Sequence, residues 1–248
     1  MALLYDIESY AHHGKDILAL QDRQRDFSPF VVHFTAQGAM RDVLEYLKFN
    51  YSNIDNKDPL NVNSILKSLE SADKESFTVF EKIASSSYLK LSSDKAKKVS
   101  LSECTLPGLL SLSARYGRFG LMFTKQFIFE KGGRPAAYVD KEIRTKLYAD
   151  SGKESKPEIL ETEYYQKTVK NFLRFTNVYD PAHYGYKFQD YTHEREWILL
   201  EQLKFEPRDI AAILVPSTDW VGKIIEMEDG KYSKIPILPL FQLYQLGA

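Results

Sequence analysis

The chain has 248 residues, of which 44% are hydrophobic and 13% aromatic, so it is long enough to bury a sizeable core. Its 33 basic and 34 acidic residues nearly cancel, which excludes a strong overall field that would attract nucleic acid or an anionic membrane in bulk. A single cysteine, Cys104, excludes an internal disulfide and disfavours a thiolate zinc site.

The N-terminal sequence indicates where the protein acts. Asp6, Glu8 and Asp16 interrupt the apolar stretch that a signal peptide would need, and no later window has the length and apolarity to span a bilayer. We therefore expect a cytoplasmic protein that does not enter a membrane. Residues 1–29 are expected to form a helical extension.

The first half is predicted to be mainly helical. A short strand, "FVVHFT" (residues 30–35), precedes "AQGAMRDVLEYLKF", whose apolar residues share one helix face. Helical spacing continues through "LNVNSILKSLE" and "SFTVFEKIASSSYLKL". A strand in "KKVSLSE" and a helix in "LPGLLSLSARYG" follow, with Pro107 near the helix start and Gly117 at its end.

The second half has more strand signals. "RFGLMFT" and "PAAYVD" are predicted strands on either side of a short helix in "KQFIFEKGG", whose two glycines supply the C-cap and turn. Residues 158–178 have helical spacing, and "EWILLEQL", "IAAILVPS" and "KIPILPLFQL" are apolar runs. A short helix is expected in "DWVGKIIEME", capped by Thr218 or Asp219.

These elements predict an α+β fold with helices around a mostly β core and a mainly helical N-terminal half. No repeat or linker divides the chain, so we expect a single domain, residues 1–248. Its core is expected to span residues 30–248, with a helical insertion at about residues 50–75.

Three segments carry candidate chemistry: "VVHFT" with His33, "ARYGRFGLMFTK" with Tyr116 and Phe119, and "EREWILL" with Glu194 and Glu196. Each has a structural interpretation as well. A histidine on a strand is commonly a hydrogen-bonded structural residue, the aromatic residues could be core, and the glutamates could be solvated charges at a strand end. Arg118 and Lys125 could likewise be ordinary surface charges.

The order of these motifs resembles a known family. The run "SLSECTLPGLLSLSARYGRFGLMFTKQFIFEKGGRPAAYVD", followed later by "YTHEREWILL", resembles the bacterial abortive-infection (phage-resistance) proteins of the AbiGi type. The resemblance covers roughly residues 30–35 and 76–216. It also extends to the scaffold of the ADP-ribosyltransferases, and therefore implies an ADP-ribosyltransferase-like β core.

The resemblance implies roles for particular residues. His33 and Thr35 would contact a ribose of NAD, Tyr116 or Phe119 would pack on nicotinamide, and Arg118 would contact pyrophosphate or a nucleic-acid backbone. Glu196 would be the catalytic glutamate, since a carboxylate beside the ribose stabilises the positive charge that develops there. NAD is then expected as co-substrate.

Other chemistries find little support. The five histidines lack a recognised metal spacing, so no metal is expected. The glycine-containing segments lack the context of a phosphate loop, and no nucleophile elbow is present.

Two hypotheses about function follow. The first is a phage-defence NAD-dependent mono-ADP-ribosyltransferase toxin that acts on nucleic acid or another host component. The second is a non-catalytic antitoxin or regulatory protein that binds a cognate toxin through the same fold.

Overall fold

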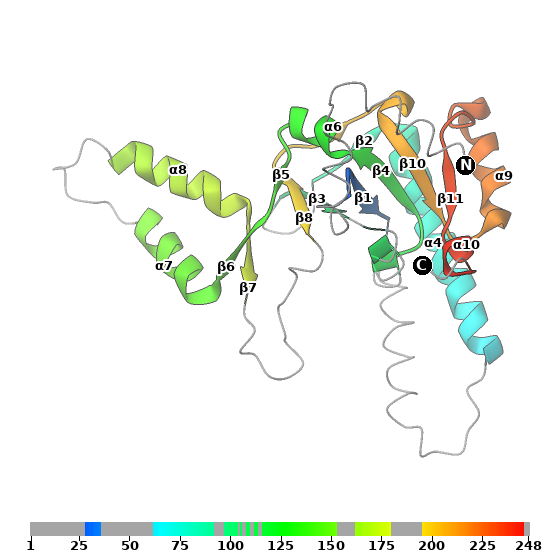
Figure 1. The fold of residues 1–248 in the computed structure, drawn as a ribbon, viewed down its shortest axis with the longest axis horizontal. Helices are drawn as coiled ribbons and strands as arrows, with labels where there is room; N and C mark the ends of the chain where they lie inside the picture. The colour runs from blue at the N-terminus through cyan, green and yellow to red at the C-terminus, as the bar shows by residue number, and fades with distance from the viewer. Residues whose placement is uncertain are drawn as a thin grey trace, which may run out of the picture. The chain divides into compact units, whose positions relative to one another are not determined.

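A computed structural model describes residues 28–35, 62–91, 97–103, 105, 108–109, 112–113, 116–152, 162–179 and 195–245 (Figure 1). The chain divides into two compact units. Unit 1 comprises Met1–Ser87, Glu103–Lys125 and Phe205–Ala248, and unit 2 comprises Tyr88–Ser102 and Gln126–Lys204. The predicted N-terminal extension and the helix expected at residues 36–49 lie outside the described residues.

Unit 1 contains a mixed sheet. Its described strands lie in the order β11 (Ile237–Pro239), β10 (Ile210–Val215), β4 (Gly120–Thr124) and β1 (Phe30–Phe34). β4 is antiparallel to both β1 and β10, whereas β11 is parallel to β10. The first four residues of β4 are buried, as expected of a strand with neighbours on both sides and a covered face.

Gly120 allows β1 and β4 to come close together. A Cβ atom at position 120 would lie 2.9 Å from Cγ1 of Val32 and 3.2 Å from the carbonyl oxygen of His33. Any side chain there would therefore crowd the neighbouring strand, which explains the glycine at the start of β4.

Helix α4 (Val62–Ser86) packs in unit 1 through a row of small and aromatic residues four apart: Ala72, Ser76, Phe80 and Ala84 are all buried. This spacing places them on one helix face. Tyr232, which is also fully buried, donates a hydrogen bond of 2.6 Å from its hydroxyl to the carbonyl oxygen of Ala84. The two predicted helical stretches therefore belong to one continuous amphipathic helix, but the second prediction is too long, because the helix ends at Ser86 and Tyr88–Leu89 form a strand.

Short helices lie before, between and after β10 and β11 in the described C-terminal part of unit 1. They are η3 (Pro207–Asp209), η4 (Thr218–Trp220), α9 (Val221–Glu226), η5 (Met227–Gly230) and α10 (Leu240–Gln245). The expected cap at Thr218 or Asp219 is wrong. Ser217 is the N-cap residue of η4, Trp220 is that of α9, and neither makes a side-chain cap hydrogen bond. A turn of 3-10 helix precedes α9 and displaces the predicted start.

The described residues of unit 2 form three small groups of strands. β3 (Val99–Glu103), β8 (Glu196–Leu199) and β5 (Arg134–Pro135) are antiparallel and lie in that order. β2 (Tyr88–Leu89) pairs with β9 (Leu203–Lys204). β6 (Ala137–Asp140) and β7 (Thr176–Tyr179) form a parallel pair. The segment "PAAYVD" thus contributes to two strands where one was predicted.

The helices in the described part of unit 2 are α6 (Lys125–Glu130, whose first residue belongs to unit 1), α7 (Lys141–Gly152) and α8 (Thr162–Arg174). After α6, Gly132 has a φ of 88° and the N–H of Gly133 donates to the carbonyl oxygen of Ile128 at 2.8 Å. A Cβ at position 133 would lie 2.4 Å from Cγ2 of Ile128. The predicted glycine turn is therefore confirmed, since a left-handed residue and a close approach each require glycine.

One predicted helix is too long. Residues 158–178 were expected to be helical, but α8 ends at Arg174 and Thr176 begins β7. The hydroxyl of Thr176 donates to the carbonyl oxygen of Leu173 at 2.8 Å, which occupies one of the carbonyls left open at a helix end. Helix α7 was not predicted, because its apolar face is weak.

The observed architecture is α+β with a mixed sheet, as predicted at that level. In "LPGLLSLSARYG" (residues 106–117), the described residues 108–109, 112–113 and 116 are helical, and Gly117, with a φ of 101°, is not. No helix in the described part of the chain combines the length and apolarity needed to cross a membrane.

Candidate functional site

Glu196 is the first residue of β8 and lies in unit 2. Its Cα is paired with that of Ser102 on β3, and Ser100 lies two residues away on the same face of the antiparallel pair. Glu196 is 7% exposed. The strand pairing thus brings a buried carboxylate beside the polar face of β3.

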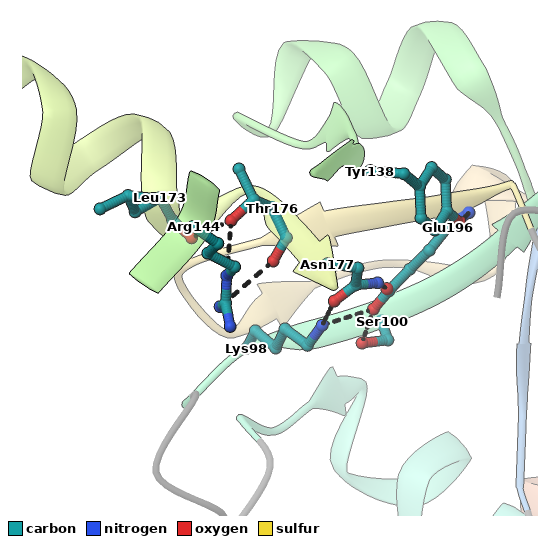
Figure 2. Close-up of polar contacts among 8 residues, drawn as sticks. All are labelled: Lys98, Ser100, Tyr138, Arg144, Leu173, Thr176, Asn177 and Glu196. Atoms are coloured by element: carbon teal, nitrogen blue, oxygen red, sulfur yellow. Dashed lines mark hydrogen bonds and ion pairs between the residues drawn. The ribbon is translucent and has the colours of Figure 1, made fainter. Parts of the chain in front are cut away.

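Three side chains donate hydrogen bonds to the Glu196 carboxylate (Figure 2). Lys98 Nζ lies 2.8 Å from Oε1 and forms an ion pair with it, and the Ser100 hydroxyl donates to the same oxygen. Asn177 donates from Nδ2 to Oε2. We call Lys98, Ser100, Asn177 and Glu196 the Glu196 cluster. Both carboxylate oxygens are engaged by protein donors.

The Glu196 cluster is cross-linked internally. Lys98 Nζ also donates to Oδ1 of Asn177 at 3.2 Å, so the lysine bridges the amide and the carboxylate. The side-chain exposures of Lys98 and Glu196 are 17% and 9%. A partly dehydrated ion pair with further hydrogen bonds holds its members in one geometry.

The backbone of Glu196 is also fixed. Its N–H donates to the hydroxyl oxygen of Tyr138 at 3.1 Å, and its carbonyl oxygen accepts from the N–H of Ala136 at 2.7 Å. Figure 2 shows the Tyr138 ring beside the Glu196 backbone. Residues just before and within β6 therefore set the position of Glu196.

A second set of contacts positions Asn177 (Figure 2). Arg144 of α7 donates from Nε to Oγ1 of Thr176 at 3.0 Å, and Thr176 in turn donates to the carbonyl oxygen of Leu173. Thr176 is 3% exposed. The start of β7 is thereby anchored to both helices, and Asn177 follows directly.

Strained backbone lies next to both members of the ion pair. Lys97 and Arg195, which immediately precede Lys98 and Glu196, each have a φ of 43°. A residue with a Cβ in this left-handed region costs about 1–2 kcal/mol. Such strain persists only where the surroundings impose it, and it concentrates at functional sites.

The other five predicted site residues lie in unit 1. His33 is a half-buried residue of β1 opposite Leu121, and Tyr116 packs half-buried against the core cluster that includes Val32 and Met122. Because Glu196 belongs to unit 2, a common site for all six residues stays a prediction.

Thr35 and Phe119 make buried contacts within unit 1. The Thr35 hydroxyl is 3.3 Å from the carbonyl oxygens of both Ser76 and Phe119. Phe119 is 0% exposed, and its ring centroid lies 5.4 Å from that of Phe77 and 4.9 Å from that of Trp220. A nicotinamide ring could stack on Phe119 only after these neighbours moved.

Arg118 forms a two-pronged ion pair with Asp73. Its Nε and Nη2 atoms lie 3.0 Å and 2.6 Å from the two Asp73 oxygens. Burial raises the pKa of Asp73, and this effect outweighs the lowering by the Arg118 charge and hydrogen bond. The Arg118 side chain is 28% exposed, so only part of it is accessible to a ligand.

A pocket of about 540 Å³ opens beside this ion pair in unit 1. Apolar and charged side chains share its wall: Lys67, Leu69, Glu70, Asp73, Arg118, Pro216, Ser217 and Phe241. Two cations and two carboxylates balance one another, so the lining charges select no particular ligand sign. Among the described residues, no group of three or more metal-ligating side chains is placed to hold a metal ion.

The sequence named Glu196 as a catalytic candidate, which stays a prediction, but did not predict the three residues that contact its carboxylate. Ser100 was detectable, since "VSLS" alternates apolar and polar residues and so gives β3 one polar face. The position of Asn177 beside Glu196 was not predictable, because residues 158–178 were assigned to a helix. Lys98 belongs to a run of lysines just before a strand, where charged residues are commonly exposed to solvent, so it was not predicted to contact Glu196.

Comparisons with known proteins found no matching family model, curated protein or solved structure.

Proposed function

We propose that this chain is a cytoplasmic phage-defence protein that acts by binding a cognate toxin protein, as an antitoxin or regulator, and does not itself catalyse ADP-ribosyl transfer. The phage-defence role rests on the AbiGi-like motifs in the sequence. The non-catalytic role is carried by one observation: both oxygens of the Glu196 carboxylate are already engaged by Lys98, Ser100 and Asn177.

A ribose hydroxyl would have to replace one of these donors. Displacing Lys98 would break a largely buried ion pair, and leaving such a charge without its partner costs about 3–5 kcal/mol. A transferase gains most from a carboxylate that is preorganised toward the reacting ribose. Glu196 is instead preorganised toward three groups of its own chain, which supports a structural role.

The unit 1 residues favour the same interpretation. Thr35 bonds to backbone carbonyls, Phe119 is enclosed by aromatic rings, and Arg118 is paired with Asp73. These three of the five expected NAD contacts therefore have internal partners that stabilise the fold. An ADP-ribosyltransferase-like scaffold that has kept its core but not its chemistry would have these properties.

The second candidate is an active NAD-dependent ADP-ribosyltransferase that modifies nucleic acid or another host component. The left-handed backbone at Lys97 and Arg195 favours it, because strain beside a polar cluster is typical of catalytic sites. In this case, Glu196 would stabilise positive charge on the ribose once Lys98 had moved away. NAD would be the co-substrate, held by His33, Thr35, Tyr116, Phe119 and Arg118.

The two candidates make opposite predictions for the purified full chain with NAD. We expect no heat of NAD binding at about millimolar concentration, and no release of nicotinamide in the presence of host nucleic acid or lysate protein. Wild type, Glu196→Gln and the exposed control Glu201→Gln should behave identically. Nicotinamide release by wild type and Glu201→Gln, but not by Glu196→Gln, would establish the transferase instead.

The binding role is tested in cells with the protein encoded by the adjacent gene. Expression of the chain alone should leave growth unchanged, and co-expression should relieve the toxicity of the neighbouring protein and yield a co-purified complex. Growth arrest by the chain alone, or an adjacent protein that neither is toxic nor binds, would overturn the proposal.

A further inference from the structure

Helix α8 carries a row of basic side chains. Lys167, Lys170 and Arg174 are exposed, and their spacing of three and four residues places them along one side of the helix. Asn171, also exposed, falls within the same row. Leu173 is buried on a different side, so the row lies away from the packed face. We call these four exposed residues the α8 row.

The surroundings of the α8 row are also basic. On α7, which runs beside α8 (Figure 1), Lys141 and Lys146 are exposed, and Glu142 is the only acid among the described side chains of the two helices. Within the described part of the chain, no carboxylate pairs with Lys167, Lys170 or Arg174. The positive charge of Lys167, Lys170 and Arg174 is therefore not neutralised by any carboxylate among the described residues.

We propose that the α8 row binds duplex DNA. A rise of 1.5 Å per residue separates Lys167 from Arg174 by about 10 Å along the helix, enough to contact about three phosphates of one strand. An Arg fork and two ammonium groups suit phosphate oxygens. Asn171, between them, has the amide that reads an adenine edge in the major groove.

The composition of the row favours duplex DNA over other nucleic acids. Single strands are held mainly by stacking on aromatic rings, and the α8 row contains none. The major groove of duplex RNA is too deep and narrow for side chains on a helix to read, whereas that of B-form DNA admits a helix. With a net charge of −1, the chain offers little bulk attraction, so binding would depend on this local row.

This DNA-binding activity is independent of whether the chain binds a toxin or transfers ADP-ribose. It is tested by fluorescence anisotropy of the full chain with a labelled DNA duplex of about two helical turns. A single strand of the same sequence and a matched RNA duplex serve as competitors. Titrations run from about 50 mM to about 200 mM salt, because the slope of log affinity against log salt concentration is proportional to the number of phosphate contacts.

The decisive variant removes three charges: Lys167→Ala, Lys170→Ala and Arg174→Ala. A matched control removes three exposed lysines elsewhere in unit 2: Lys90→Ala, Lys131→Ala and Lys204→Ala. We expect the α8 variant to lose at least about tenfold in duplex affinity and its log–log salt slope to fall by about 3, while the control binds like wild type. Unchanged thermal unfolding confirms that both variants are folded.

Three outcomes would overturn the proposal. The first is the absence of duplex binding by wild type at about 50 mM salt. The second is an equal loss of duplex affinity in the control variant, which would show that binding depends on the total charge of the chain and not on the α8 row. The third is equal or tighter binding of single-stranded DNA or duplex RNA.

Discussion

Asp73 in unit 1 and Glu196 in unit 2 are buried carboxylates that are neutralised in different ways. Asp73 in unit 1 meets a single guanidinium, that of Arg118, whereas Glu196 in unit 2 meets an ammonium, a hydroxyl and an amide from separate positions in the chain. Their exposures are similar, 5% and 7%. Burial alone therefore does not decide how a carboxylate is held.

The two carboxylates differ in the number of residues that donate hydrogen bonds to them. For Asp73 the cost of burial outweighs the attraction of Arg118, and the pKa of its carboxyl is raised. Glu196 accepts from three donors that come from unconnected segments and are useful only in the folded chain. We infer that the Glu196 cluster stabilises the arrangement of unit 2. The Asp73–Arg118 pair instead lines a pocket, and burial of the charged form of Asp73 there is unfavourable.

The largest effect is expected from Glu196→Ala. It leaves the ammonium of Lys98 and the amide of Asn177 without their carboxylate in a largely buried position, and should lower the free energy of unfolding by about 3–5 kcal/mol. Urea unfolding monitored by circular dichroism measures the change. Glu201→Ala, at an exposed site, should change it by less than about 0.5 kcal/mol. A loss below about 1 kcal/mol for Glu196→Ala would contradict the stabilising role.

Arg118→Met should have a smaller effect, about 2 kcal/mol at neutral pH, because Arg118 is partly exposed and Asp73 can bind a proton when its partner is lost. The matched control is Arg208→Met, which removes an exposed ion pair with Glu206 and should cost at most about 0.5 kcal/mol. Equal effects of the two variants in urea unfolding would show that the buried pair behaves like a surface pair.

The raised pKa of Asp73 predicts the sign of a pH dependence. Between its ordinary value of 3.8 and its raised value, the folded state binds more protons at Asp73 than the unfolded state does. The contribution of Asp73 to stability therefore falls as pH rises through that interval. Asp73→Asn should be most destabilising, relative to wild type, at low pH and less so at about pH 7. A relative stability that changes in the opposite direction between about pH 4 and about pH 7 would refute this.

The smallest effect is expected from Arg195→Gly. Glycine adopts a φ of 43° without strain, and although it is more flexible when unfolded, the net change should be a stabilisation of about 0.5 kcal/mol. Thermal unfolding measures it, and Glu201→Gly, at an exposed site without a positive φ, is the control. A destabilisation by Arg195→Gly would show that the arginine side chain makes contacts worth more than the strain.

Much of the fold was predictable because it depends on local patterns. The β-branched and apolar runs of β1, β4 and β10, and the glycines after α6, specify strands and a turn from their own composition. β7 was not predictable, since Thr176 and Asn177 continue an amphipathic helix in the sequence. Only pairing with β6 ends that pattern.

The sequence by itself determined the α+β class and the main strands and marked Glu196 as a candidate residue, because apolar periodicity and residue chemistry are local properties. Tertiary structure alone decided which groups surround its carboxylate. Lys98, Ser100 and Asn177 converge on it from positions 98, 96 and 19 residues away in the chain. Hydrogen bonds over such separations depend on strand pairing and register, which no local pattern specifies. The same carboxylate that the sequence marks as a catalytic candidate is thereby held in a network that supports a structural role.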